Sequence, residues 1–332
     1  MRNARVARLL PLAMLFLVLL ALPMVVTRSY YMHIVLLTGY YMLLALSVNL
    51  VTGFTGNLFL AAAAFSGIGA YASALLTMKW GFPFWLALPA AGFVAAVFGF
   101  VLGYPCLRLI GPYFSIATFG FGEITRLVFV NWYSVTNGPL GIRGIPGPGR
   151  IGIGPLSASI DSRLSYYYLL LGIILISTYV LYRIINSHIG RAFWAIRSET
   201  FMLAQMIGIN ATKIKIYSFM VTAFFCGMAG SFYAHYMRFI SPDTFVFPES
   251  AAAVAMAVVG GMGTITGPII GAILLGVSVE LLRVVSQYRM VVYGLVMIVS
   301  VLFMPEGLVG VARRIFSQRR RVAAAGVPAR RG

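Results

Sequence analysis

Charged residues are scarce in this 332-residue sequence: they make up 10% of it, and only 7 residues are Asp or Glu. Soluble domains carry about 25% charged residues. Because 61% of the residues are hydrophobic, the chain has too little polar surface to cover a soluble globule, which excludes a soluble enzyme. The apolar runs are continuous rather than alternating, so the sequence predicts an all-α, polytopic membrane protein rather than a barrel.

Phosphate-binding, catalytic and metal-binding motifs are also missing. The chain has three lysines, and none stands in a G-x-x-x-x-G-K-[ST] sequence, which excludes ATP binding by a P-loop. No nucleophile–base constellation is visible. The three histidines match no metal-ligand spacing, so we expect no metal site. Cys106 and Cys226 lie far apart, near or inside apolar runs, and are typical of small core residues.

The charge that is present is strongly basic, with 25 Lys and Arg and a net charge of +18. In a membrane protein this favours cytoplasmic loops that meet anionic lipid, and we expect no nucleic-acid partner. With the N-terminus in the cytoplasm, sixteen basic residues fall inside and eight outside. The sequence therefore predicts a multi-pass protein with both termini in the cytoplasm.

Ten apolar runs are the candidate spans, and we expect eight to ten transmembrane helices. They are Leu9–Val26, Tyr30–Val51, Leu58–Thr77, Phe84–Pro105, Pro112–Val130, Tyr166–Ile185, Tyr217–Met237, Ser250–Val259, Pro268–Leu282 and Met290–Met304. The first exceeds the apolar core of a signal peptide and lacks a small-residue cleavage site, so we expect a retained span. The eighth is too short to cross about 30 Å of hydrocarbon. It either extends through the glycines that follow or dips in and returns.

Around these runs the chain divides into a basic N-terminus (1–8), a transmembrane domain (9–304) and a basic cytoplasmic tail (305–332). Two long connections interrupt the domain. The outer loop, 131–165, contains the turn-forming run NGPLGIRGIPGPG, which neither spans nor forms a helix. A docking surface and a bare connector are both open for it.

The second connection is a cytoplasmic loop, 186–215, that predicts an amphipathic helix. Its apolar residues Phe193, Ile196, Leu203 and Ile207 repeat at helical spacing, and Gly208 is placed to end the helix. Such a helix lies on lipid or inserts into a groove of another protein.

Two glycine-rich breaks interrupt the apolar runs, TGFTGN at residues 52–57 and VGGMGTITGP at residues 259–268. Irregular backbone inside a membrane must line a cavity or be buried in protein. Paired breaks in the two halves of a chain point to a transport path, whereas small-residue packing explains either break alone. A further candidate is Glu123, a carboxylate within a span that Arg126 can pair with from the same helix face.

Several of these segments together resemble the branched-chain amino-acid ABC permeases of the LivM type. The residues that carry the resemblance are GRAFWAIRSETFMLAQMIGINATKIK (190–215), NLVTGFTGNL (49–58), FSIATFGFGEI (114–124), NGPLGI (137–142), AFFCGMAGSFYAH (223–235) and VGGMGTITGP (259–268). They keep their order and cover most of residues 44–307. The cytoplasmic loop matches the family's EAA-type motif only loosely, because Thr200 and Phe201 replace two alanines.

The resemblance implies a membrane subunit of an ATP-driven importer that forms half of a path for Leu, Ile or Val. It implies a LivH-type permease partner, two cytoplasmic ATPases that carry ATP and Mg²⁺, and a periplasmic binding protein, all at a bacterial inner membrane. This chain then binds no cofactor itself. The implied ATPase-coupling residues are Arg191, Phe193, Ile196, Arg197, Glu199, Leu203, Ala204, Gly208 and Ile209. The candidate path or hinge residues are Gly53, Thr55, Gly56, Asn57, Thr118, Phe119, Gly120, Phe121, Glu123, Gly260, Gly261, Gly263 and Thr264.

Three alternatives stay open at this point. A urea or short-chain amide importer has similar permeases, and no residue here decides between the two substrates. A gradient-driven secondary transporter usually places several acids within its spans, whereas Glu123 is the single clear candidate here. A membrane scaffold without solute flux is disfavoured by the paired glycine breaks and the long basic loop.

Overall fold

The computed structural model describes residues 28–106, 111–151, 158–159, 162–197, 210–281 and 307–310, and the single positions 23, 109, 291, 294, 295 and 298. The longer helices are α2 (Ser29–Asn49), α3 (Ala62–Lys79), α4 (Phe84–Cys106), α5 (Pro112–Asn131), α7 (Arg163–Ile185), α10 (Ala211–Met237), α11 (Phe247–Gly260) and α12 (Thr266–Leu281). The shorter elements are η1 (Leu50–Phe54), α6 (Tyr133–Thr136), η2 (Gly138–Leu140), α8 (His188–Ile196), η4 (Pro242–Thr244) and strands β1 (Ile142–Arg143), β2 (Arg150–Ile151), β3 (Ala158–Ser159) and β4 (Phe239–Ile240).

Within the described residues, six helical segments are long and apolar enough to cross a membrane. They are Ser29–Phe54, Phe84–Cys106, Pro112–Asn131, Arg163–Ile185, Ala211–Met237 and Pro242–Gly260. The prediction of a polytopic helical membrane protein is confirmed. The expected first and last spans, Leu9–Val26 and Met290–Met304, lie almost wholly outside the described residues.

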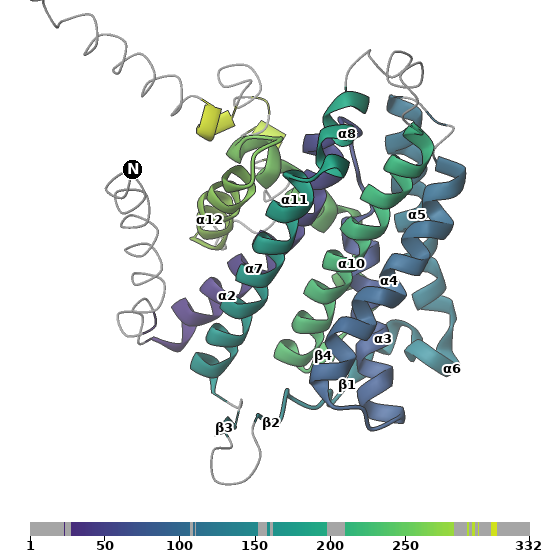
Figure 1. Cartoon of the computed structure of the whole chain (residues 1–332). Helices are drawn as coiled ribbons and strands as arrows, with labels where there is room; N and C mark the ends of the chain where they lie inside the picture. Colours follow the sequence, from purple (N-terminus) through teal and green to yellow (C-terminus); the bar gives the residue numbers. More distant parts are fainter. Residues whose placement is uncertain are drawn as a thin grey trace, which may run out of the picture.

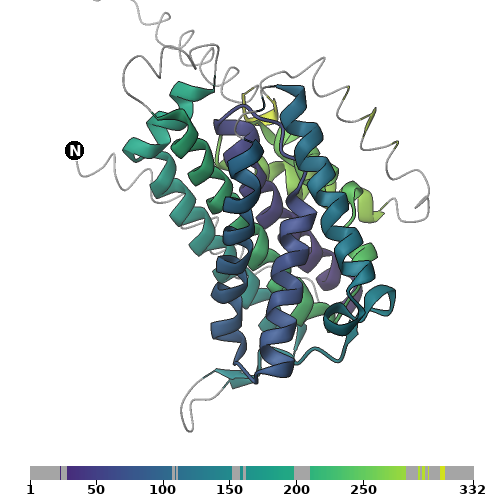
Figure 2. The ribbon, with the colours of Figure 1, turned by 90° about the vertical axis from the view of Figure 1, so that its right-hand side faces the viewer.

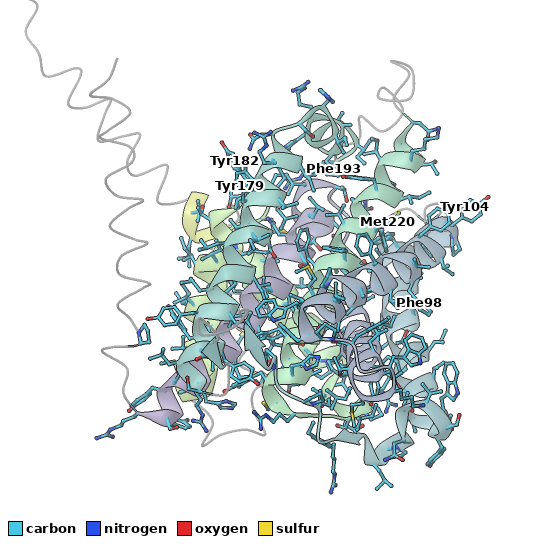
Figure 3. The ribbon with its side chains drawn as sticks, turned by 60° about the horizontal axis from the view of Figure 1, so that its bottom comes forward. Phe98, Tyr104, Tyr179, Tyr182, Phe193 and Met220 are labelled. Carbon is cyan, nitrogen blue, oxygen red and sulfur yellow. The ribbon has the colours of Figure 1, made fainter. Side chains whose placement is uncertain are left out.

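Apolar side chains cover the outside of this helical bundle as well as its core. Phe98 and Tyr104 on α4, and Tyr179 and Tyr182 on α7, are exposed and point outward on opposite sides of the molecule (Figure 3). Such a surface suits contact with lipid or with another membrane helix, because either contact keeps the apolar side chains out of water.

The centre of the bundle is α10, which packs against α2, α3 and α4. Close approach depends on small residues: a Cβ on Gly230 would clash with the Ser66 carbonyl of α3, and one on Gly69 of α3 would clash with the Gly227 backbone. In lipid the hydrophobic effect does not drive helices together, so their association depends on van der Waals contact, which close approach of the backbones provides.

The two ends of the bundle carry different structures. Helix α8 lies at one end, and strands β1 and β4 lie at the other (Figure 1). A view turned by 90° gives the same arrangement (Figure 2). The outer loop, whose run at 137–149 was expected to contain no helix, includes the 3-10 turn η2, and α6 precedes that run. Strand β1 of this loop pairs antiparallel with β4, with Ile142 opposite Ile240. The loop is therefore more than a bare connector.

A buried histidine also fastens this loop to the bundle. The His235 ring on α10 hydrogen-bonds through Nδ1 to the Pro146 carbonyl at 2.6 Å and through Nε2 to the Ser73 hydroxyl at 2.8 Å. Ser231 donates to the same Ser73 hydroxyl at 2.7 Å.

The structure shows how the chain continues after the short apolar run at 250–259. Helix α11 ends at Gly260 instead of continuing through the glycines, and the chain reverses into α12. The 14 residues of α11 measure about 21 Å at 1.5 Å per residue. The preceding turn η4 extends the apolar segment to 19 residues, which makes it one of the six candidate spans. Helices α11 and α12 pack closely through glycines: a Cβ on Gly271 would clash with the Met256 carbonyl.

Candidate translocation path and coupling helix

The first glycine break interrupts the chain between α2 and α3. The α-helix changes at Leu50 into the π-helical turn η1, and residues 55–61 are irregular. Hydroxyl groups from three elements accept hydrogen bonds from the backbone that follows: Thr52 from Phe59 N (3.2 Å), Thr118 from Leu60 N (3.2 Å) and Ser250 from Ala63 N (2.9 Å). Irregular backbone at membrane depth requires such internal partners.

Of the residues predicted around this break, Gly53 and Thr55 are buried, and Asn57 is partly exposed. Thr55 donates to the Val51 carbonyl at 2.7 Å, and the Asn57 amide lies 3.3 Å from the Thr55 carbonyl. Sequence reasoning found Thr118 but missed the roles of Thr52 and Ser250. A hydroxyl residue beside a glycine break was the available signal for Thr52.

The second glycine break is the tight turn between α11 and α12. Gly261 and Gly263 have φ angles of 124° and 73°, a region that favours glycine. Thr264 Oγ1 donates to the Gly261 carbonyl at 2.8 Å and accepts from Gly267 N at 3.0 Å, which closes the turn.

The structure brings the two breaks together. The Asn49 side chain, which is 2% exposed, accepts from Gly263 N at 3.0 Å and donates to the Thr264 carbonyl at 2.7 Å. A Cβ on Gly53 would lie 2.5 Å from Gly263 N. Asn49 was missed as a site residue. It looks like an ordinary helix position in the sequence, and its partners lie more than 200 residues away.

Helix α8 is amphipathic, as the sequence predicts, but it ends at Ile196 and not at the predicted Gly208. Ser187 caps its N-terminus by accepting from Ile189 N at 3.2 Å. Phe193 is fully buried in a cluster with Leu50, Phe54, Leu181 and Phe225 of η1, α7 and α10, and Ile196 packs against Ala211. Arg191 is exposed on the other face. The predicted residues Glu199, Leu203, Ala204, Gly208 and Ile209 lie outside the described residues.

The C-terminal end of α8 reaches both breaks. The Trp194 ring packs edge-on against Phe54 of η1, with centroids 5.6 Å apart, and the Arg197 guanidinium lies 4.9 Å from the Trp194 ring centroid. A Cβ on Gly56 would lie 2.9 Å from the Arg197 carbonyl, and one on Gly263 would lie 2.8 Å from Arg197 Nη1. Trp194 had not been predicted.

Helix α5 carries the remaining predicted residues except Gly260, and it is the least buried of the six candidate spans. Glu123 and Arg126 form an ion pair at 2.6 Å, and their side chains are 41% and 26% exposed. Phe119 packs edge-on against Phe247 of α11 (4.9 Å), and Phe121 stacks on Phe65 of α3 (5.3 Å). Gly120 faces open space. Gly260 lies apart from these residues, buried between α11 and α12.

Two further carboxylates in a candidate span were missed, Asp243, which lies 3.9 Å from Arg126, and Glu249. Glu249, near the start of α11, accepts a hydrogen bond from the Tyr41 hydroxyl of α2. The sequence placed it just outside the apolar run that begins at Ser250. Within the described ranges, no three His, Cys, Asp or Glu residues are grouped to hold a metal ion.

Comparison with known proteins assigns the chain to a family. Residues 30–301 match a family model described as "Branched-chain amino acid transport system / permease component". The chain belongs to this permease family. It is similar to the high-affinity branched-chain amino acid transport system permease protein LivM of Salmonella typhimurium strain LT2, with 36% identity over 90% of this chain and 74% of that protein. For LivM of Escherichia coli K12 the identity is 37%, over 91% of this chain and 75% of that protein.

The permease is also similar to LivH proteins. It is 26% identical to the LivH permease protein of Escherichia coli K12, over 81% of this chain and 91% of that protein. No solved structure matches the permease significantly. It is a multi-pass membrane transport subunit rather than an enzyme.

Proposed function

We propose that this permease is the membrane-spanning subunit of an ATP-driven importer, and that it forms half of a path for leucine, isoleucine and valine. Its partners are a LivH-type permease, two cytoplasmic ATPases that bind ATP and Mg²⁺, and a periplasmic binding protein that delivers the amino acid. It lies in a bacterial inner membrane with α8 and both termini on the cytoplasmic side.

The observation that carries the proposal is the position of α8 at one end of the bundle. Its buried face packs on η1, and its C-terminal residues contact both glycine breaks. Its other face, which carries Arg191, is exposed. An ATPase that docks on this exposed face moves α8, and the contacts transmit the motion to irregular backbone within the membrane.

The exposed face of α5 supports a path between two permease chains. Glu123 and Arg126 are costly against lipid even as a pair, because the hydrocarbon solvates neither charge. We propose that the LivH-type partner and the water-filled path cover this face. Phe119 and Gly120 then line the path beside the ion pair.

The substrate is inferred from the relatives, whose printed names specify branched-chain amino acids. The test is uptake by the purified complex, reconstituted with the partner subunits and the binding protein. We expect leucine uptake that requires ATP and stops without the binding protein. ATP-dependent uptake of urea in place of leucine would transfer the proposal to an amide importer.

The same uptake assay distinguishes this importer from a gradient-driven transporter that works without partner subunits. The proposal predicts no uptake by the permease alone and no effect of ionophores on the complete complex. Uptake by this chain alone that an ionophore abolishes would contradict the proposal.

A further inference from the structure

Three segments that are far apart in the sequence meet around Asn49. Asn49, at the α2–η1 boundary, bonds directly to the α11–α12 turn. The third segment, the C-terminal end of α8, reaches the same junction through Arg197, which lies beside Gly56 and Gly263. We propose that Asn49 is a positioning residue that makes the two glycine breaks move as one unit when α8 moves. This inference rests on the proposed function and adds a specific mechanical link to it.

The hydrogen-bond geometry of Asn49 favours a specific connection between the two breaks over non-specific packing. Asn49 uses both its acceptor and its donor on consecutive residues of the turn, Gly263 and Thr264. It is buried, so water does not compete for these bonds. A Cβ on Gly53 would clash with Asn49 Oδ1, so only a glycine one turn later in the chain leaves room for the amide.

The α8 side of the junction is equally specific. Arg197 stacks on Trp194, and the pair lies against Gly56 of the first break and Gly263 of the second. Helix α8 contacts both breaks, and Asn49 bonds one break to the other. A displacement of α8 that moves one break therefore also displaces the other.

The alternative is a structural role, in which Asn49 only satisfies polar atoms of a static turn. The two roles differ in what its loss changes. A static role predicts lower stability and proportional losses of ATP hydrolysis and transport. A linking role predicts that ATP hydrolysis continues while less substrate is carried for each ATP.

The test uses Asn49→Ala in the complete reconstituted importer, with leucine uptake and ATP hydrolysis measured together. We expect the ratio of leucine to ATP to fall by about fivefold or more, the lower end of typical couplings between sites. Ser47→Ala is the matched control. Ser47 is buried in the same helix, and its hydroxyl donates to the Leu43 carbonyl at 2.6 Å, with no bond to either break. The control should keep the wild-type ratio.

Hydrogen exchange on the same complexes provides a readout independent of transport. In the wild type, peptides over 50–60 and 258–268 should change protection together when a non-hydrolysable ATP analogue binds. In Asn49→Ala the second peptide should no longer follow the first. If Asn49→Ala does not assemble, Asn49→Asp, which keeps an acceptor for Gly263 N but loses the donor to Thr264, must give the same results.

An unchanged leucine-to-ATP ratio in the variant, with the two peptides still changing together, would overturn the inference. Failure of the proposed function is distinguishable, because the wild-type complex would then transport no branched-chain amino acid with ATP.

Discussion

At the residue scale, glycine decides how closely the helices approach. Gly230 on α10 meets the backbone of α3, whereas Gly172 on α7 has open space where its Cβ would stand. Both lie inside helices, so their backbone conformations are comparable. Substituting alanine at each position therefore separates the steric effect of the added Cβ from the effect of replacing a helical glycine.

We therefore expect Gly230→Ala to destabilise the permease by about 1–3 kcal/mol, the usual cost of overpacking a close contact. Gly172→Ala should leave stability unchanged or raise it slightly, since alanine is the better helix former. Thermal unfolding midpoints in one detergent measure both variants. Equal unfolding midpoints would show that α3 and α10 can move apart to accommodate the added methyl group at no cost in stability, which would contradict the prediction.

The ion pair on α5 gives a second prediction at this scale. Arg126→Ala leaves Glu123 as an unpaired carboxylate within a span, whereas Arg126→Ala with Glu123→Ala removes both charges. We expect the single variant to be less stable and less active than the double variant. Additive effects in a double-mutant cycle of unfolding midpoints would mean that the pair contributes nothing.

Residue partners were harder to predict than residue types. Glu123 and Arg126 pair within one helix, so their spacing was enough to predict the contact. Asn49 and Ser250 bond to segments far along the chain, and no local pattern encodes such a partner. Glu249 was missed because its helix begins two residues before it, at Phe247, and not at the apolar run.

At the element scale, the spans were predictable because lipid fixes both their length and their composition. Expected runs such as Phe84–Pro105 and Tyr166–Ile185 match α4 and α7 within a few residues. The start of α10 differs. It begins at Ala211, where Asn210 caps it by accepting from Lys213 N, although the two lysines had placed this turn in the loop.

Helix α8 gives a prediction at this scale. Truncating its buried anchor in Phe193→Ala should loosen α8 from η1 and α7, at a cost of about 3–5 kcal/mol for a fully buried aromatic. We expect normal membrane insertion with uptake largely lost. Arg191→Ala, on the exposed face, should keep the fold and weaken only ATPase binding. Quantitative co-purification of the ATPases and proteolysis of the loop measure the two effects.

The proposed path along α5 predicts a labelling pattern. Gly120→Cys should react with a small aqueous thiol reagent in at least one nucleotide state of the complex. Val97→Cys, on the exposed apolar face of α4, should not react, because lipid covers it. The natural Cys106 and Cys226 are buried and give a low background. If Gly120→Cys stays unreactive in every state, α5 does not line the path.

At the scale of the whole molecule, the bundle has one end that carries α8, where we propose that the ATPases dock, and one end fastened by the outer loop. Helix α8 lies at the first end, and the β1–β4 pair with the His235 contacts lies at the second. The orientation follows from basic residues alone and remains a prediction. The family assignment shows that the chain is a transport permease. The path itself stays a proposal, because it depends on the face that we expect a second permease to cover.

The most direct measurement is purification of this chain from its native membrane in a gentle detergent, followed by mass spectrometry of the intact assembly. The account predicts one copy of this chain with a second permease of the same family and two ATPases. A lone chain, under conditions that keep other membrane complexes intact, would contradict it.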